Sequence, residues 1–167
     1  MVRAVLFFLP TCGHCEYVIN DVLPGLFEEA GGAPDLYYDE TLDPGRVAFH
    51  LMDNGRLEML LVDASVYEGS NLFYAATDAF DIPSGGVPRL IVGDRCLIGS
   101  VDIPEQFPGI VLGALGSGES IDWPEIPGLA QATIDFFATS ASFAAATAAA
   151  TSAPPATSGN RIAKTTR

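Results

Sequence analysis

The chain has 167 residues, of which 49% are apolar, and these values match one globular domain with a tail. Acidic residues outnumber basic residues 21 to 8, for a formal net charge of −13. Such a surface repels the phosphates of nucleic acids, so no nucleic-acid partner is expected. Three cysteines are too few for the disulfide framework of a small secreted domain.

The first predicted element is the apolar run VRAVLFFL, residues 2–9, which ends at Pro10. Its β-branched and aromatic residues predict a strand buried on both faces, as in the centre of a parallel sheet. One positive charge, Arg3, precedes the uninterrupted apolar residues of this segment, as in a signal peptide, but the apolar stretch is too short and no small-residue cleavage site follows it. The compartment is left open: extracytoplasmic if an upstream segment is missing, cytoplasmic otherwise.

A C-x-x-C pair, Cys12 and Cys15, comes directly after this strand. The segment that follows has helical spacing up to two glycines at 31–32, and Pro24 predicts a kink or break after Leu23. The apolar positions that define this helix are Val18, Ile19, Val22, Leu23, Leu26 and Phe27.

Residues 33–56 contain turn signals at 43–45 and 54–55, and they are interpreted as an insertion whose own structure the sequence does not define. Residues 57–65 are predicted to form the second strand. Ser65 and Glu68 have the spacing of a capping box, which predicts a helix that continues to Phe80. Its inner face is expected to include Leu72, Phe73, Ala76 and Phe80.

The segments 87–94 and 95–102 are two short apolar strands joined through Gly93 and Asp94, hence an antiparallel hairpin. A last helix is expected over 103–118, with Asp102 as its cap, and the segment around Trp123 is expected to pack back on the domain. The order is β-α-(insertion)-β-α-β-β-α. It predicts an α/β domain with a mixed four-stranded sheet, whose first two strands are parallel, flanked by helices.

Composition changes towards the C-terminus, so the domain is assigned to residues 1–130 and a low-complexity tail or linker to 131–167. From about 138 the chain is rich in Ala, Ser and Thr, which favours disorder. Residues 136–153 are uncharged, but their many Ser and Thr residues argue against a membrane span. The tail could instead tether the domain to a membrane redox partner.

Three interpretations of the cysteine pair compete. Zinc needs about four ligands, and the remaining candidates, His14, His50 and Cys96, are scattered, so no metal is expected. A disulfide that closes so small a loop restrains few unfolded conformations and stabilises little. Thiol–disulfide exchange explains both the spacing and the position after a strand.

The redox interpretation assigns a role to each residue of the motif. Unpaired N–H groups and the positive end of the helix dipole stabilise a thiolate at a helix N-terminus. Cys12, the more N-terminal, would attack a substrate disulfide, and Cys15, one turn further, would resolve the mixed disulfide. Gly13 would let the turn close and a partner backbone approach, and His14 would favour the reduced thiolate form and thereby make the disulfide more oxidising.

The motif PTCGHC between a strand and a helix, with GGVPRLIVGD far downstream, resembles the thioredoxin superfamily. The Gly-His dipeptide is the one seen in catalytic domains of protein disulfide isomerase. The resemblance, which covers about residues 2–115, implies a thioredoxin-like fold and a cis-proline at Pro88 opposite the cysteines. It also implies that Val87 offers backbone hydrogen bonds to a bound substrate strand. No cofactor is implied, because the two cysteines are themselves the redox centre.

The chain departs from this family at two positions beside the motif. Thr11 stands where a Trp often precedes the first cysteine, so the substrate-contacting surface is altered. Leu6 stands where a buried carboxylate often assists proton transfer to and from the resolving thiol. The core is closer to the minimal glutaredoxin-like arrangement, although no glutathione site can be traced.

The sequence therefore predicts a monomeric thiol–disulfide oxidoreductase that acts on protein or peptide thiols, with a preference for oxidase or isomerase chemistry. An electron-carrying reductant for a membrane partner and a non-enzymatic interaction module of the same fold are the alternatives. Cys96, in an apolar strand, is expected to be a buried, inert thiol. His50 is expected to lie at the surface or to be partly packed, with a contact near the substrate groove as its functional alternative.

Overall fold

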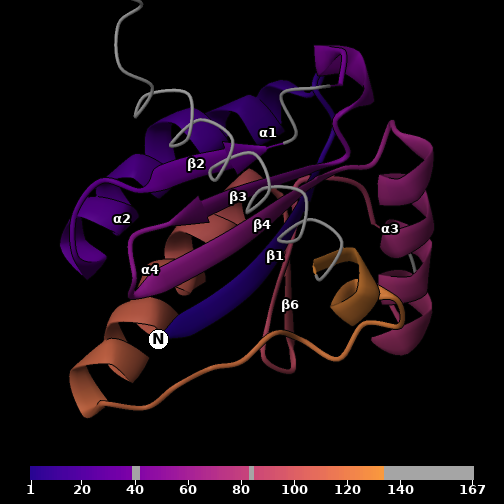
Figure 1. Ribbon diagram of the computed structural model, residues 1–167. Helices are drawn as coiled ribbons and strands as arrows, with labels where there is room; N and C mark the ends of the chain where they lie inside the picture. The colour runs from indigo at the N-terminus through magenta and orange to yellow at the C-terminus, as the bar shows by residue number, and fades with distance from the viewer. Residues whose placement is uncertain (39–41, 83–84, 134–167) are drawn as a thin grey trace, which may run out of the picture.

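The computed structural model describes residues 1–38, 42–82 and 85–133, which form a six-stranded mixed sheet with helices on both faces (Figure 1). The strand order is β2-β3-β4-β1-β5-β6. The strands are β1 (Val2–Phe8), β2 (Asp35–Tyr38), β3 (Phe49–Asp53), β4 (Leu57–Asp63), β5 (Arg89–Val92) and β6 (Arg95–Ile98). The helices are α1 (Gly13–Tyr17), a π-helical segment (Val18–Val22), α2 (Leu23–Ala30), a short 3-10 turn (Pro44–Arg46), α3 (Tyr67–Ala79) and α4 (Gly99–Ser117).

Strand β1 lies at the centre of the sheet, as the apolar run predicts. It runs parallel to β4, in register from Val2–Leu57 to Phe8–Asp63, and antiparallel to β5. Its central residues are fully buried because helices cover both faces. The parallel pair and the antiparallel β5–β6 hairpin are both confirmed.

The expected four-stranded sheet is wrong, because residues 33–56 contribute two further strands. β3 pairs antiparallel with β4, and β2 pairs antiparallel with β3 at the edge of the sheet. All four residues of β2 are exposed, so no face of this strand shows the apolar alternation that marks a half-buried strand. The segment is thus an extension of the sheet on the side of β4.

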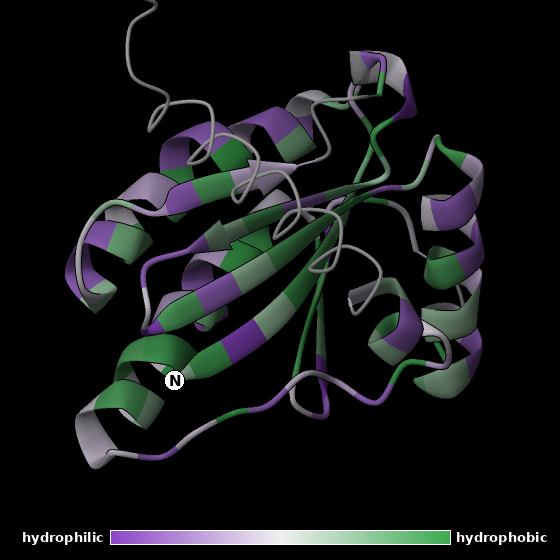
Figure 2. Ribbon diagram, viewed as in Figure 1, coloured by the Kyte–Doolittle hydropathy of each residue, from purple (hydrophilic) through white to green (hydrophobic). Residues whose placement is uncertain are grey.

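The sheet separates two apolar clusters, and Figure 2 shows green, hydrophobic residues along much of the central strands. One cluster packs the π-helical segment, α2 and α4 against one face, and Leu6 belongs to it. The other packs α3 and residues 126–129 against the opposite face. Leu72 and Ala76 are buried as predicted for α3, while Phe73 and Phe80 are partly buried against the same cluster.

Two helix starts differ from the predicted ones. α3 begins at Tyr67 with Val66 as its N-cap, and the Ser65 hydroxyl donates to the carboxylate of Asp63, so the capping box is wrong. α4 begins at Gly99, because β6 ends at Ile98 and the next residues already adopt helical conformation. Asp102 therefore lies in the first turn of α4 and does not cap it.

Near Pro24, where a kink or break was predicted, the chain stays helical but changes type: the π-helical segment ends at Val22, α2 begins at Leu23, and Pro24 lies in the first turn of α2. A first-turn position suits proline, because the hydrogen bond that proline cannot donate is not needed there. α1, the π-helical segment and α2 thus form one helical run in three parts.

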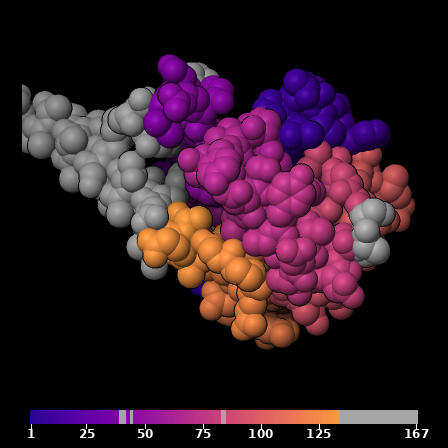
Figure 3. All heavy atoms as spheres, turned by 90° about the vertical axis from the view of Figure 1, so that its right-hand side faces the viewer, coloured from indigo at the N-terminus to yellow at the C-terminus, as the bar shows by residue number. Residues whose placement is uncertain are grey.

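The segment after α4 packs back on the domain, as predicted. Ile121 forms a β-bridge with Val2, and Ile126 and Leu129 are buried against the α3 face. Figure 3 shows this part of the chain, in orange, beside the magenta surface of α3. Within the described ranges no helix is long and apolar enough to cross a membrane, and the predicted low-complexity region from 138 onward lies outside those ranges.

Candidate active site

Cys12 occupies the turn between the central strand and the helical run. β1 ends at Phe8 and the chain turns through Pro10, where the Cys12 N–H donates to the carbonyl of Leu9 at 3.1 Å. Cys12 is the N-cap of α1, and its carbonyl accepts from the N–H groups of Cys15 and Glu16. Its thiol is partly exposed, so a sulfur atom lies at the surface at the first turn of a helix.

Cys15 lies one turn further and points into the protein. Its backbone N–H also donates to the sulfur of Cys12 at 3.4 Å, while its own side chain is only 1% exposed. Burial, followed by the hydrogen bond with Cys12, raises the pKa of the Cys15 thiol to about 12. The pair thus has one accessible sulfur and one buried, protonated sulfur, both in the free thiol form.

Val87 and Pro88 face this pair from the loop before β5. The Cys12 thiol donates to the carbonyl oxygen of Val87 at 3.7 Å, across 75 positions of sequence. The Val87–Pro88 peptide bond is cis, as the family resemblance implies, and Pro88 is buried. The structure therefore brings Cys12, Cys15, Val87 and Pro88 together.

His14 is exposed and held by a residue that the sequence did not indicate. Its Nδ1 lies 2.8 Å from the hydroxyl oxygen of Ser100, and the protonation of the imidazole decides which of the two donates. Ser100 lies in the first turn of α4, which contacts α1. Ser100 was missed because residues 95–102 were predicted as a strand. In addition, no sequence pattern links His14 to a residue 86 positions away.

Thr11 and Gly13 flank Cys12 and are both exposed. The fold itself does not require glycine at position 13, because its φ is not in the left-handed region and a Cβ there would meet no atom within 4 Å. The expected tight turn therefore does not require glycine at position 13. Only the close approach of a partner backbone would require the absence of a side chain there. Leu6 is fully buried in the cluster formed with the π-helical segment, α2 and α4, so an apolar side chain fills that position.

Cys96 lies on the other side of the sheet from Cys15. It packs with the α3 cluster, and its thiol is partly exposed where full burial was expected. Burial raises the pKa of Cys96, and the positive charge of Arg89 opposes that shift. Arg89 is itself buried; it donates to the Thr77 hydroxyl and the Gly85 carbonyl, and its guanidinium lies over the ring of Phe73. Cys96 is thus separated from the cysteine pair by the sheet.

His50, in β3, is partly buried between the rings of Phe8 and Tyr38, which agrees with the partly packed position expected for it. Its Nδ1 is buried and has no hydrogen-bond partner among the residues with described positions. Burial lowers the pKa of His50, and the negative charge of Asp63 opposes that shift. The imidazole is therefore held in a packed, neutral setting.

Across residues 1–38, 42–82 and 85–133, no group of three or more His, Cys, Asp or Glu side chains is close enough to hold a metal ion. Comparisons of the chain with protein-family models, with curated proteins and with solved structures found no match.

Proposed function

We propose that the protein is a thiol–disulfide oxidoreductase with a thioredoxin-like fold, and that it exchanges electrons with protein or peptide thiols through Cys12 and Cys15. The observation that carries the proposal is the asymmetry of the pair. Cys12 offers a partly exposed sulfur that accepts an N–H bond from Cys15, and Cys15 keeps a buried thiol one turn behind it. This is the arrangement that an attacking and a resolving cysteine need.

In the reducing direction, the Cys12 thiolate attacks one sulfur of a substrate disulfide. The S–S bond of the substrate breaks, a Cys12–substrate disulfide forms, and the departing substrate sulfur takes up a proton. Cys15 then loses its proton and attacks the sulfur of Cys12, which releases the second substrate thiol. Two electrons have passed to the substrate, and the reverse sequence oxidises a substrate dithiol.

The surroundings of Cys12 favour a protein or peptide substrate. The Val87 carbonyl, which lies beside the sulfur, is a backbone acceptor that an extended peptide can use. Tyr17 in α1 and Val101 in the first turn of α4 are 45% and 62% exposed, and α1 contacts α4. Exposed apolar side chains of this kind suit a polypeptide substrate better than a small thiol.

The test is to trap the mixed disulfide. The resolving cysteine is removed with Cys15→Ser in a Cys96→Ser background, and the protein is incubated with a peptide that contains one disulfide. With two peptide chains joined by that disulfide, mass spectrometry is expected to find one chain linked to Cys12 and the other released as a free thiol. The proposal fails if no such adduct forms while the peptide still exchanges with added dithiothreitol.

A further inference from the structure

Arg89 is the first residue of β5, directly after Pro88, and its side chain is buried, with 1% of its surface exposed. A guanidinium stays charged under all ordinary conditions, so its burial costs free energy unless polar partners surround it. Within the described ranges no carboxylate forms an ion pair with Arg89. Neutral groups therefore hold this buried charge.

The neutral partners of Arg89 come from two different segments. Its Nη1 donates to the Thr77 hydroxyl at 2.6 Å, and its Nη2 donates to the Gly85 carbonyl at 2.9 Å. The guanidinium carbon also lies 4.1 Å from the centre of the Phe73 ring. Its Nε is buried and has no hydrogen-bond partner among the residues that the structure describes. The planar fork of the guanidinium thus joins α3 to the loop before Pro88.

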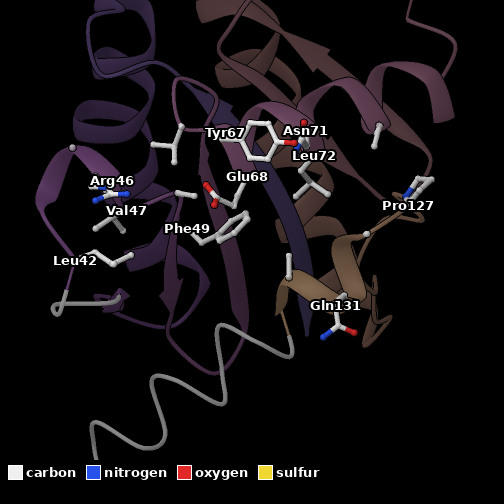
Figure 4. Close-up of a pocket in the computed structure, with 16 residues that line it drawn as sticks. Leu42, Arg46, Val47, Phe49, Tyr67, Glu68, Asn71, Leu72, Pro127 and Gln131 are labelled. Atoms are coloured by element: carbon white, nitrogen blue, oxygen red, sulfur yellow. The ribbon is translucent and has the colours of Figure 1, made fainter.

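α3 is the fixed end of this connection. The Thr77 hydroxyl donates to the carbonyl of Phe73 at 2.8 Å, and its oxygen lone pairs remain free to accept from Arg89. A different side of α3 borders a groove, where Figure 4 shows Tyr67, Asn71 and Leu72. Because Leu72 and Ala76 are buried in the core, α3 is a firm anchor for the guanidinium.

The loop at the other end carries the carbonyl that faces Cys12. The Val87 carbonyl accepts from the Cys12 thiol at 3.7 Å. In the described part of the chain, the backbone of residues 85–87 makes no hydrogen bond to another backbone group, so side-chain contacts hold it. Gly85 is closely packed: a Cβ there would lie 3.3 Å from Nη2 of Arg89 and 2.9 Å from Cδ1 of Ile98.

We propose that Arg89 is a positioning residue, which holds residues 85–88 so that the backbone of Val87 lies beside Cys12 where an extended peptide can bind it. The inference rests on the proposed function and adds to it a residue outside the C-x-x-C pair. A lysine at position 89 would keep the charge, but an ammonium group lacks the planar fork that reaches both Thr77 and Gly85. Loss of either bond leaves a buried polar group unpaired and lets the Val87 carbonyl move.

NMR order parameters of the full-length protein test whether Arg89 holds the loop. The Val87 N–H is expected to have an order parameter of about 0.85 in the unaltered protein and below about 0.6 in Arg89→Lys and in Thr77→Val. Thr77→Val keeps the branched shape and removes the hydroxyl, whereas Thr77→Ser keeps the hydroxyl and is expected to preserve the order parameter. Unchanged values in Arg89→Lys and Thr77→Val would overturn the proposal.

Single-turnover kinetics test whether the held loop serves the substrate. The reduced protein is mixed with rising concentrations of a peptide that contains one disulfide, and oxidation of the Cys12–Cys15 pair is followed. Arg89→Lys is expected to raise the half-saturating peptide concentration about tenfold. The limiting rate should stay the same, because the loop contributes to binding and not to the exchange between sulfur atoms.

Two controls separate positioning from a general loss of structure. Arg95→Lys makes the same exchange at an exposed arginine of β6 and is expected to leave the half-saturating concentration unchanged. Iodoacetamide needs no peptide-binding loop, so it is expected to alkylate Cys12 at the same rate in Arg89→Lys and in the unaltered protein. A slower or faster alkylation in Arg89→Lys would assign Arg89 a structural role and overturn the proposal.

Failure of this inference differs from failure of the proposed function. If the unaltered protein is oxidised by the peptide and Arg89→Lys has the same half-saturating concentration, only the positioning role of Arg89 is wrong. If the peptide does not oxidise the unaltered protein at all, the proposed function is wrong and the positioning role is overturned with it.

Discussion

The imidazole of His14, between the two cysteines, is joined to the Ser100 hydroxyl at the start of α4 by a contact of 2.8 Å. Ser100 thereby fixes the orientation of the side chain that is expected to favour the reduced, thiolate form of the pair. The proposed direction of electron flow thus depends on a residue outside the C-x-x-C motif.

Replacing Ser100 with alanine should make the Cys12–Cys15 disulfide less oxidising. One hydrogen bond contributes about 0.5–1.5 kcal/mol, which corresponds to a shift of roughly 10–30 mV for a two-electron couple. The potential is measured against glutathione buffers, with Ser117→Ala at the far end of α4 as the control. A Ser100→Ala potential equal to that of the control would show that His14 acts without its partner.

Cys15 should resist alkylation at pH values where Cys12 reacts. Burial raises the pKa of Cys15 to about 12, so its thiol stays protonated near neutral pH and only the thiolate is a nucleophile. The reduced protein is treated with iodoacetamide from pH 7 to pH 10, and the modified cysteine is mapped by mass spectrometry. Of the two cysteines in the pair, Cys12 is expected to be modified and Cys15 to stay unmodified over most of this range. Equal labelling of the two cysteines at pH 8 would contradict the buried position of Cys15.

His50 should make the protein less stable in mild acid. Burial lowers the pKa of His50 below its ordinary value of 6.5. Below that pH the unfolded chain therefore takes up a proton that the folded chain does not, and stability falls as pH falls. His50→Leu keeps an apolar side chain between Phe8 and Tyr38 and removes this titration.

Urea unfolding at pH 7.5 and pH 5 measures the effect. The free energy of unfolding is expected to fall less between these pH values for His50→Leu than for the unaltered protein. At pH 7.5 His50 is neutral in both the folded and the unfolded protein. The measurement at pH 7.5 is therefore the reference for the measurement at pH 5. Identical pH dependence in the two proteins would mean that His50 does not titrate differently on folding.

Gly69 should tolerate no side chain, whereas Gly113 should benefit from one. A Cβ on Gly69, in α3, would overlap the backbone carbonyl oxygen of Asp63, so the helix would have to move away from β4. A Cβ on Gly113, in α4, meets no atom within 4 Å. Gly69→Ala is expected to destabilise by about 2 kcal/mol or more, and Gly113→Ala to stabilise by about 0.5–1 kcal/mol. Thermal unfolding of both variants checks the contrast, and equal effects would contradict the close packing of α3 on β4.

The core of the fold could be predicted because its elements carry strong local patterns. The continuous apolar run of β1 indicated a central strand, and Gly93 with Asp94 indicated the hairpin of β5 and β6. β2 had no such pattern, since all its residues are exposed and its pairing depends on β3. The start of α4 was hidden because residues 95–102 were predicted as one strand and the N-cap, Ile98, is an apolar residue with no capping side chain.

The candidate site could be predicted only where chain proximity or family resemblance supplied it. Cys12 and Cys15 are neighbours in sequence, and the position of Pro88 came from the resemblance. Ser100 could not be found, because its contact with His14 is made by a fold that brings α4 against α1.

The central claim is that Cys12 and Cys15 form a reversible redox couple, and equilibration with glutathione buffers of graded potential tests it most directly. Alkylation of the remaining thiols, followed by mass spectrometry, gives the oxidised fraction at each potential. We predict a two-electron transition closer to about −180 mV than to about −270 mV, lost in Cys12→Ser and in Cys15→Ser and kept in Cys96→Ser. Absence of a Cys12–Cys15 disulfide in the most oxidising buffer would contradict the account.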